Sequence, residues 1–201
     1  QKGKPFAPNA EQKALLTESV AIGNVTARSI LFSPQDPKAY IYPAKAGYWQ
    51  TGFPGGSHEY LVNNGNGGRD MDGRTLIFNL ATVNTPAMVL ELPGVGSQYT
   101  FSSRDSSGAY LDGSKTYKVN IPANPPAQRF WSFVVYDPQT RSMLQSKEMP
   151  YPSKNNKRNP EMAKNADGSI DLYFGPEAPA GQEANWVKTV PGKGWSVSYT
   201  H

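Results

Sequence analysis

The segment from Phe130 to Tyr136, FWSFVVY in one-letter code, constrains the fold more than any other stretch. Alternate side chains of a strand point to opposite faces, and both faces of this segment are apolar except at Ser132. A strand that is apolar on both faces must be covered on both, so we expect the central strand of a β-rich core. The turn sequence Asp137-Pro138 is typical of a type I turn and ends the strand.

Length and composition favour one large β domain. A chain of 201 residues is within the ~200–250 residues that all-β domains reach as single units. The many turn formers, 19 Gly and 18 Pro, suit short strands joined by turns and long loops. We therefore predict a single β-sandwich domain over residues 1–201, made of an N-terminal helical segment (1–34), aromatic-rich loops with a short helix (35–95) and the main strands (96–201).

Period-two alternation and turn signals predict the strands. The clearest alternation is Trp195, Val197 and Tyr199 against the polar residues between them. The predicted strands are residues 99–104, 116–121, 130–136, 143–145, 170–174 and 195–199.

Residues 9–32 predict an N-terminal helix that packs against the sandwich. Asn9 and Gln12 form a capping-box pattern, and Ser33-Pro34 ends the helix. The predicted packing face carries apolar residues near helical spacing, namely Leu16, Val20, Ala27 and Ile30 or Leu31.

Residues 74–83 fit two structures. Leu76, Phe78 and Leu80 alternate as in a strand, whereas Leu76, Leu80 and Val83 form a helical stripe. In the helical alternative Asp72 caps the start and Asn84 closes the end. The β propensity of Thr75, Ile77 and Phe78 favours the strand, so the pattern alone leaves both alternatives open.

The aromatic segment over residues 36–61 supplies the candidate ligand site. Its flat rings either stack on a glycan or other small ligand, or they cover the sandwich core. We name Tyr48, Trp49, His58 and Arg74 as the candidate ligand-binding residues.

The sequence predicts no catalytic residue, metal site or cofactor. The chain has no cysteine, and His201, the last residue, is expected to fray. His58 lacks the partners that a metal site needs. The sequence DMDG at 70–73 is an incomplete calcium loop, and we interpret it as an Asp72 helix cap with Asp70 paired to Arg69 or Arg74.

Charge and hydropathy exclude two classes of partner. The net charge is +4, and the densest basic run, residues 154–158, is interpreted as a solvated loop rather than a nucleic-acid surface. No apolar run reaches the ~18 residues of a membrane span. The absence of cysteine fits a periplasmic or extracellular protein. Because the chain begins at Gln1 and not at Met, we expect a processed or excised piece of a longer protein.

Several motifs together resemble the C-terminal module of a bacterial family of unknown function, whose paired domains are catalogued as domains of unknown function 1254 and 1214. The motifs are residues 72–75 and 85–88, 111–117, 129–137, 165–175 and 183–186. The resemblance implies a jelly-roll-like antiparallel β sandwich with an N-terminal α-helix and a short helix over residues 74–83. It also implies export, and it provides no catalytic residues to carry over.

The chain departs from this family at both ends. The β-rich first domain is absent, and the chain stops at His201 where family members continue, so we expect either a fragment or an open sheet edge beside residues 195–199. Three hypotheses follow. They are a binding or interaction module for a glycan or cell-envelope component, a hydrolase whose site is shared with the missing domain, and a structural subunit. The expected partners are a glycan or small molecule, and a second β domain or further copies of the chain.

Overall fold

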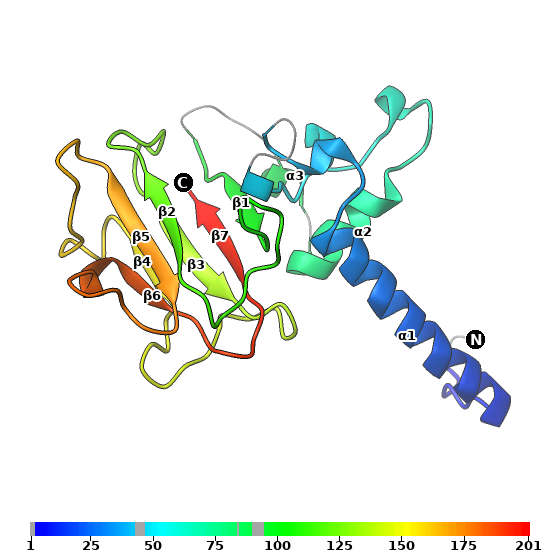
Figure 1. Ribbon diagram of the computed structural model, residues 1–201. Helices are drawn as coiled ribbons and strands as arrows, with labels where there is room; N and C mark the ends of the chain where they lie inside the picture. The colour runs from blue at the N-terminus through cyan, green and yellow to red at the C-terminus, as the bar shows by residue number, and fades with distance from the viewer. Residues whose placement is uncertain (1–2, 43–46, 84, 90–94) are drawn as a thin grey trace.

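A computed structural model describes residues 3–42, 47–83, 85–89 and 95–201 (Figure 1). Strands in the order β1-β7-β3-β4 form one sheet, and strands in the order β2-β5-β6 form the other. The strands are β1 (Tyr99–Ser102), β2 (Tyr117–Ile121), β3 (Ser132–Tyr136), β4 (Ser153–Asn155), β5 (Ile170–Gly175), β6 (Trp186–Lys188) and β7 (Ser196–Thr200). The helices are α1 (Ala10–Phe32), α2 (Met71–Ala81) and α3 (Pro86–Val89), with short 3-10 turns at Pro37–Ala39, Pro54–Gly56, Asn63–Gly65 and Glu183–Asn185.

The main core lies between the two sheets and is organised around β3. Phe133 and Val135 of this strand are buried, and the Phe133 ring contacts the rings of Trp49, Trp131, Phe174 and Tyr199. The prediction of a central strand is confirmed, because β3 lies between β7 and β4.

Coverage of the other face of β3 is incomplete. Val134 and Tyr136 are half-buried beneath the helical segment, and Phe130, which precedes the strand, is 36% exposed. The expectation of a fully covered ribbon is therefore wrong at Phe130.

The sheet topology differs from the expectation in two respects. The structure shows two open sheets of four and three strands, and a jelly roll is not shown. β6 pairs with β5 in parallel, so the sandwich is not wholly antiparallel. This pairing is supported by the indole Nε1 of Trp186, which donates a hydrogen bond to the Gly175 carbonyl at 2.9 Å.

Two strands escaped prediction and one predicted strand is absent. The strands β4 and β6 have three residues each, and a strand of this length is too short for a period-two pattern to be recognised in the sequence. Residues 143–145 form only an isolated bridge between Met143 and Tyr136, while Leu144 is buried in the core.

The C-terminal strand lies inside the four-stranded sheet and not at its edge. β7 pairs with β1 on one side and with β3 on the other, so the expected open edge beside residues 195–199 is wrong. The last residue is also held. His201 exchanges two backbone hydrogen bonds with Gln98 and its ring stacks on Tyr199 at 5.1 Å, so the expected fraying is wrong.

α1 begins and ends as predicted but does not pack as predicted. The capping box is present, since the Asn9 side chain accepts from the Gln12 backbone N–H at 2.8 Å, and Ser33 is the C-cap. Only Leu31 of the helix is buried, and Val20 is 71% exposed. The helix therefore extends away from the body and contacts α2 near its C-terminal end (Figure 1).

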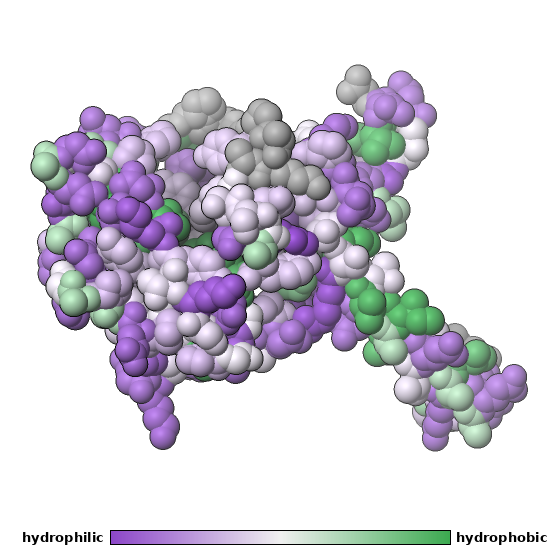
Figure 2. Space-filling model, in the orientation of Figure 1, coloured by the Kyte–Doolittle hydropathy of each residue, from purple (hydrophilic) through white to green (hydrophobic). Residues whose placement is uncertain are grey.

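The distribution of apolar side chains explains this arrangement. Leu15, Ile22 and Val25 lie on a different side of α1 from Leu16 and Val20, so the helix has no single apolar stripe. All five side chains are exposed, and apolar residues are visible along the helix in Figure 2. None of the described helices is both long and apolar enough to cross a bilayer.

The segment with two alternatives is helical. α2 is capped by Asp70, whose carboxylate accepts from the Gly73 N–H at 2.8 Å, so the assignment of Asp72 as the cap is wrong. The C-cap of the helix is Thr82, whose backbone is in the left-handed conformation. The predicted end, Asn84, lies outside the described residues.

The helices are attached to the sandwich by a second, smaller core and by hydrogen bonds from arginine side chains. The smaller core consists of Leu31, Ala39, Leu76 and Phe101. The Arg104 guanidinium donates to the Phe32 carbonyl at the end of α1 at 3.3 Å and to the Gly108 carbonyl at 2.7 Å. These contacts hold the helical layer over the outer face of the four-stranded sheet.

Candidate functional site

A cavity of about 420 Å³ lies between the outer face of the four-stranded sheet and the helices. We call it the sheet–helix cavity. Its floor comes from β1, β7 and β3, and its roof comes from the end of α1, from α2 and from α3. The lining is mainly apolar, with Phe32, Phe53, Ile77, Leu80 and Phe101 among its members.

Small side chains on β7 leave room for the cavity. Ser196, Ser198 and Thr200 face the helices along the middle of the sheet, where a tightly packed layer would need large apolar residues. Larger side chains of β1 and β3, such as Phe101 and Val134, line the cavity on either side. The alternation over residues 195–200 was visible in the sequence, but it did not show what its polar face contacts. The structure places it in this cavity.

The turn from Asp137 to Arg141 forms one end of the cavity. The Asp137 carboxylate accepts hydrogen bonds from Lys193 Nζ at 2.9 Å and from the Gln139 N–H at 2.7 Å. Burial favours the neutral carboxyl, but these hydrogen bonds outweigh it and lower the pKa of Asp137 below the ordinary value of 3.8. Asp137 is therefore an ionised, fully partnered turn residue at neutral pH.

This pKa predicts acid sensitivity of the turn. Because the pKa of Asp137 is lower in the folded than in the unfolded chain, its stabilising contribution is present above about pH 4 and is lost as the pH falls through the folded value. We expect the urea midpoint of the wild-type chain to fall below about pH 4. The stability difference between wild type and Asp137→Asn should shrink over the same range. A difference that stays constant from pH 7 to pH 3 would contradict this assignment.

A second cavity, of about 570 Å³, lies beside α2 and is more open than the first. It brings together two of the predicted ligand-binding residues, His58 and Arg74, with Arg69 and Tyr60. Burial, followed by the negative charge of Asp70, raises the pKa of Tyr60 to about 12. The Tyr60 hydroxyl donates to the Gly52 carbonyl at 3.0 Å, so it serves as a structural hydrogen-bond donor.

The other two predicted residues lie elsewhere. Trp49 packs edge-to-face on Phe133 of the main core, and Tyr48 makes an edge contact with Tyr40, with ring centroids 6.4 Å apart in each pair. The Arg104 guanidinium lies 6.0 Å from the Tyr48 ring centroid. The four candidates therefore do not form one site, and their role in ligand binding stays a prediction.

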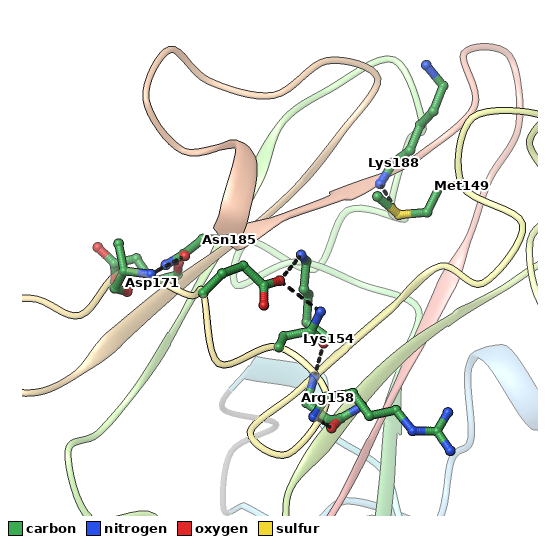
Figure 3. A network of polar contacts seen from close by, with 10 residues as sticks. Met149, Lys154, Arg158, Asp171, Asn185 and Lys188 are labelled. Atoms are coloured by element: carbon green, nitrogen blue, oxygen red, sulfur yellow. Dashed lines mark hydrogen bonds and ion pairs between the residues drawn. The ribbon is translucent and has the colours of Figure 1, made fainter.

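The densest basic run is partly structural. Lys154 is buried in β4 and its Nζ pairs with Glu161 at 3.4 Å, so the interpretation of residues 154–158 as a solvated loop is wrong at this position (Figure 3). The side chain of Asn155 accepts from the Arg158 N–H at 2.8 Å and shapes the following turn.

Asn185 completes this polar network. It is buried, and its side chain donates to the carbonyls of Asp171 and Ala163 and accepts from the Ala163 N–H (Figure 3). Every hydrogen-bonding group of this side chain except one acceptor position is engaged with backbone, so we assign the network a structural role.

The described residues offer little for acid–base chemistry. They contain no group of three or more His, Cys, Asp and Glu side chains able to hold a metal ion. Five described carboxyl groups have a pKa that differs from the ordinary value, and in all five it is lowered. Hydrogen bonds to each of these groups favour its charged form. These groups are Asp105, Asp137, Glu161, Asp167 and Asp171. A general acid at neutral pH needs the opposite shift.

Comparison with known proteins supports the resemblance noted in the sequence. Residues 96–200 match the family described as "Protein of unknown function (DUF1214)". The pairing with the domain numbered 1254 is not shown by this match and stays a prediction. No curated protein matches the chain.

Two solved bacterial structures are similar to the chain. The VPA0106 protein from Vibrio parahaemolyticus is 21% identical, with a TM-score of 0.48 over 98% of this chain and 42% of its own. An uncharacterised protein from Burkholderia cenocepacia is 16% identical, with a TM-score of 0.39 over 92% of this chain and 44% of its own. The chain therefore spans less than half the length of either relative.

Proposed function

The chain belongs to the family described as "Protein of unknown function (DUF1214)", and on that premise we propose that it is an exported, non-enzymatic binding module. The ligand site is the sheet–helix cavity, and the ligand is a component of the cell envelope. The cysteine-free composition supports export. The lowered pKa values of Asp105, Asp137, Glu161, Asp167 and Asp171 support binding rather than acid catalysis by these groups.

The observation that carries this proposal is the apolar cavity itself. Binding sites for small molecules typically have volumes of about 300–1,000 Å³ and mostly apolar linings with a few polar groups. The sheet–helix cavity has this size and lining, and the hydroxyls of Ser196, Ser198 and Thr200 supply the polar groups. An apolar ligand fits this lining better than a glycan, whose many hydroxyls would lose hydrogen bonds to water.

The two competing hypotheses predict different features. A hydrolase would need a partner domain to supply acid–base groups next to this surface. A structural subunit would use an open sheet edge, and β2 is the best candidate because it is the longest of the edge strands and pairs only with β5. Its exposed residues Lys118 and Asn120 oppose strand addition, so we place this hypothesis second.

The proposal predicts specific binding of a neutral apolar dye. We expect Nile red to bind the wild-type chain with a stoichiometry of one. Ser198→Phe places a ring in the middle of the cavity and should weaken this binding at least tenfold, a loss of about 1.4 kcal/mol. Fluorescence titration measures both dissociation constants.

The matched control is Ser106→Phe, in an exposed turn outside the cavity lining. It should leave dye binding unchanged, with circular dichroism confirming that both variants fold. Equal binding by wild type and Ser198→Phe would place the dye elsewhere, for instance on the exposed residues of α1, and would refute the proposed site.

A further inference from the structure

We propose that the sheet–helix cavity takes an amphiphile with one anionic head group, a carboxylate or a phosphate, and that Arg141 binds this head. The inference rests on the proposed function, because it names the class of ligand for the same cavity. Its basis is the charge at the end of the cavity, where the Asp137–Arg141 turn meets α2.

The described lining contains two charged residues, Asp137 and Arg141. Asp137 pairs with Lys193 and accepts from the backbone N–H of Gln139, whereas Arg141 has no ionic partner among the described residues. The Arg141 guanidinium donates only to the Asn79 carbonyl, at 3.1 Å, among the described residues. Since a guanidinium carries five N–H donors, most of them remain available to an anion at the cavity mouth.

Two further cations make this end of the cavity positive. Arg28 of α1 donates to the carbonyls of Pro138 and Gln139 at 3.1 and 3.4 Å. Lys193 contacts the same turn through Asp137. Arg28, Arg141 and Lys193 thus surround a turn with a single carboxylate, and this excess of positive charge favours an anionic group over a neutral or cationic one.

The position of Arg141 is held before any ligand arrives. Its backbone adopts a positive φ of 62°, and its N–H donates to the Asp137 carbonyl at 2.7 Å. Its side chain bridges to α2 through Asn79. A group fixed from both ends loses little conformational entropy on binding, so it makes an effective anchor.

The floor of the cavity suits an extended chain. Ser196, Ser198 and Thr200 occupy alternate positions of β7 and span about 13 Å at ~3.3 Å per residue. Apolar residues line both sides of this row, including Phe101 and Val134. An aliphatic chain lying along β7 would bury its surface there while its charged end reaches the turn.

Three probes of equal chain length test this inference: laurate, dodecyl phosphate and dodecanol. We expect wild type to bind laurate or dodecyl phosphate at least tenfold more tightly than dodecanol. Arg141→Gln should abolish this preference and leave the affinity for dodecanol unchanged, whereas Arg141→Lys should retain part of it. Displacement of Nile red gives each dissociation constant, and the tighter of the two anionic probes identifies the head group.

Arg158→Gln is the matched control, because Arg158 is an exposed arginine of the polar network and does not line the cavity (Figure 3). It should leave all three affinities unchanged. Binding of dye and dodecanol without a preference for anions would overturn this inference and leave the proposed function intact. Failure of dye and all three probes to bind would overturn both. If Arg141→Gln and Arg158→Gln lost the same amount of affinity for the anionic probes, the role of Arg141 would also be overturned.

Discussion

Phe133→Ala is expected to lower the free energy of unfolding by about 3–5 kcal/mol. Phe133 is 3% exposed, and its ring contacts aromatic rings from both sheets and from the segment that precedes α2. Truncation removes these contacts and leaves a cavity where β3 meets the second sheet. Since domains of this size have total stabilities of about 5–15 kcal/mol, the loss is a large share of the whole.

Urea denaturation followed by tryptophan fluorescence measures this loss. Phe130→Ala is the matched control, because Phe130 lies three residues earlier and is 36% exposed. Its truncation should cost about 1–2 kcal/mol, since the side chain is already partly exposed to solvent and its removal leaves no enclosed cavity. Equal losses in the two variants would show that β3 is not the centre of the core.

Gly113→Ala is expected to cost about 3 kcal/mol or more. A Cβ atom at this position would overlap the Val190 carbonyl oxygen and lie 2.8 Å from the Lys193 carbonyl oxygen. The same segment is held by hydrogen bonds, since the Gly113 N–H donates to Lys193 and its carbonyl accepts from the Thr189 hydroxyl. The added methyl group must separate two backbones that these bonds hold together.

Gly194→Ala provides the comparison, because Gly194 lies on the facing segment. Its Cβ atom would lie 3.6 Å from the Leu111 carbonyl oxygen, an ordinary contact, so we expect a change within about 0.5 kcal/mol. Thermal and urea unfolding of both variants measure the difference. Similar stabilities for the two variants would contradict the close approach of residues 113 and 190.

The candidate site shows where sequence reasoning reached its limit. The row of small residues on β7 was visible as an alternation, but its partner surface comes from α1 and α2, more than 100 residues earlier in the chain. Arg141 carried no motif, and the role we propose for it depends on the pairing of Asp137 with Lys193. The predicted residues Tyr48 and Trp49 were chosen for their ring type, and the structure places Trp49 against the core.

The local structure was readable from the sequence because its causes are local. A continuous apolar run predicted β3, and apolar–polar alternation predicted β7, since neighbouring side chains of any strand point to opposite faces. The Asn9–Gln12 capping box predicted the start of α1, because both hydrogen bonds lie within one turn. The family resemblance decided that residues 74–83 are helical, where the pattern allowed two structures.

Only the tertiary structure decided what these elements enclose. The parallel pairing of β6 with β5, the exposure of α1 and the sheet–helix cavity all depend on side-chain volumes and contacts summed over segments far apart in the chain. A periodic pattern states which face of an element is apolar. It does not state which other element covers that face, or whether the two leave space between them.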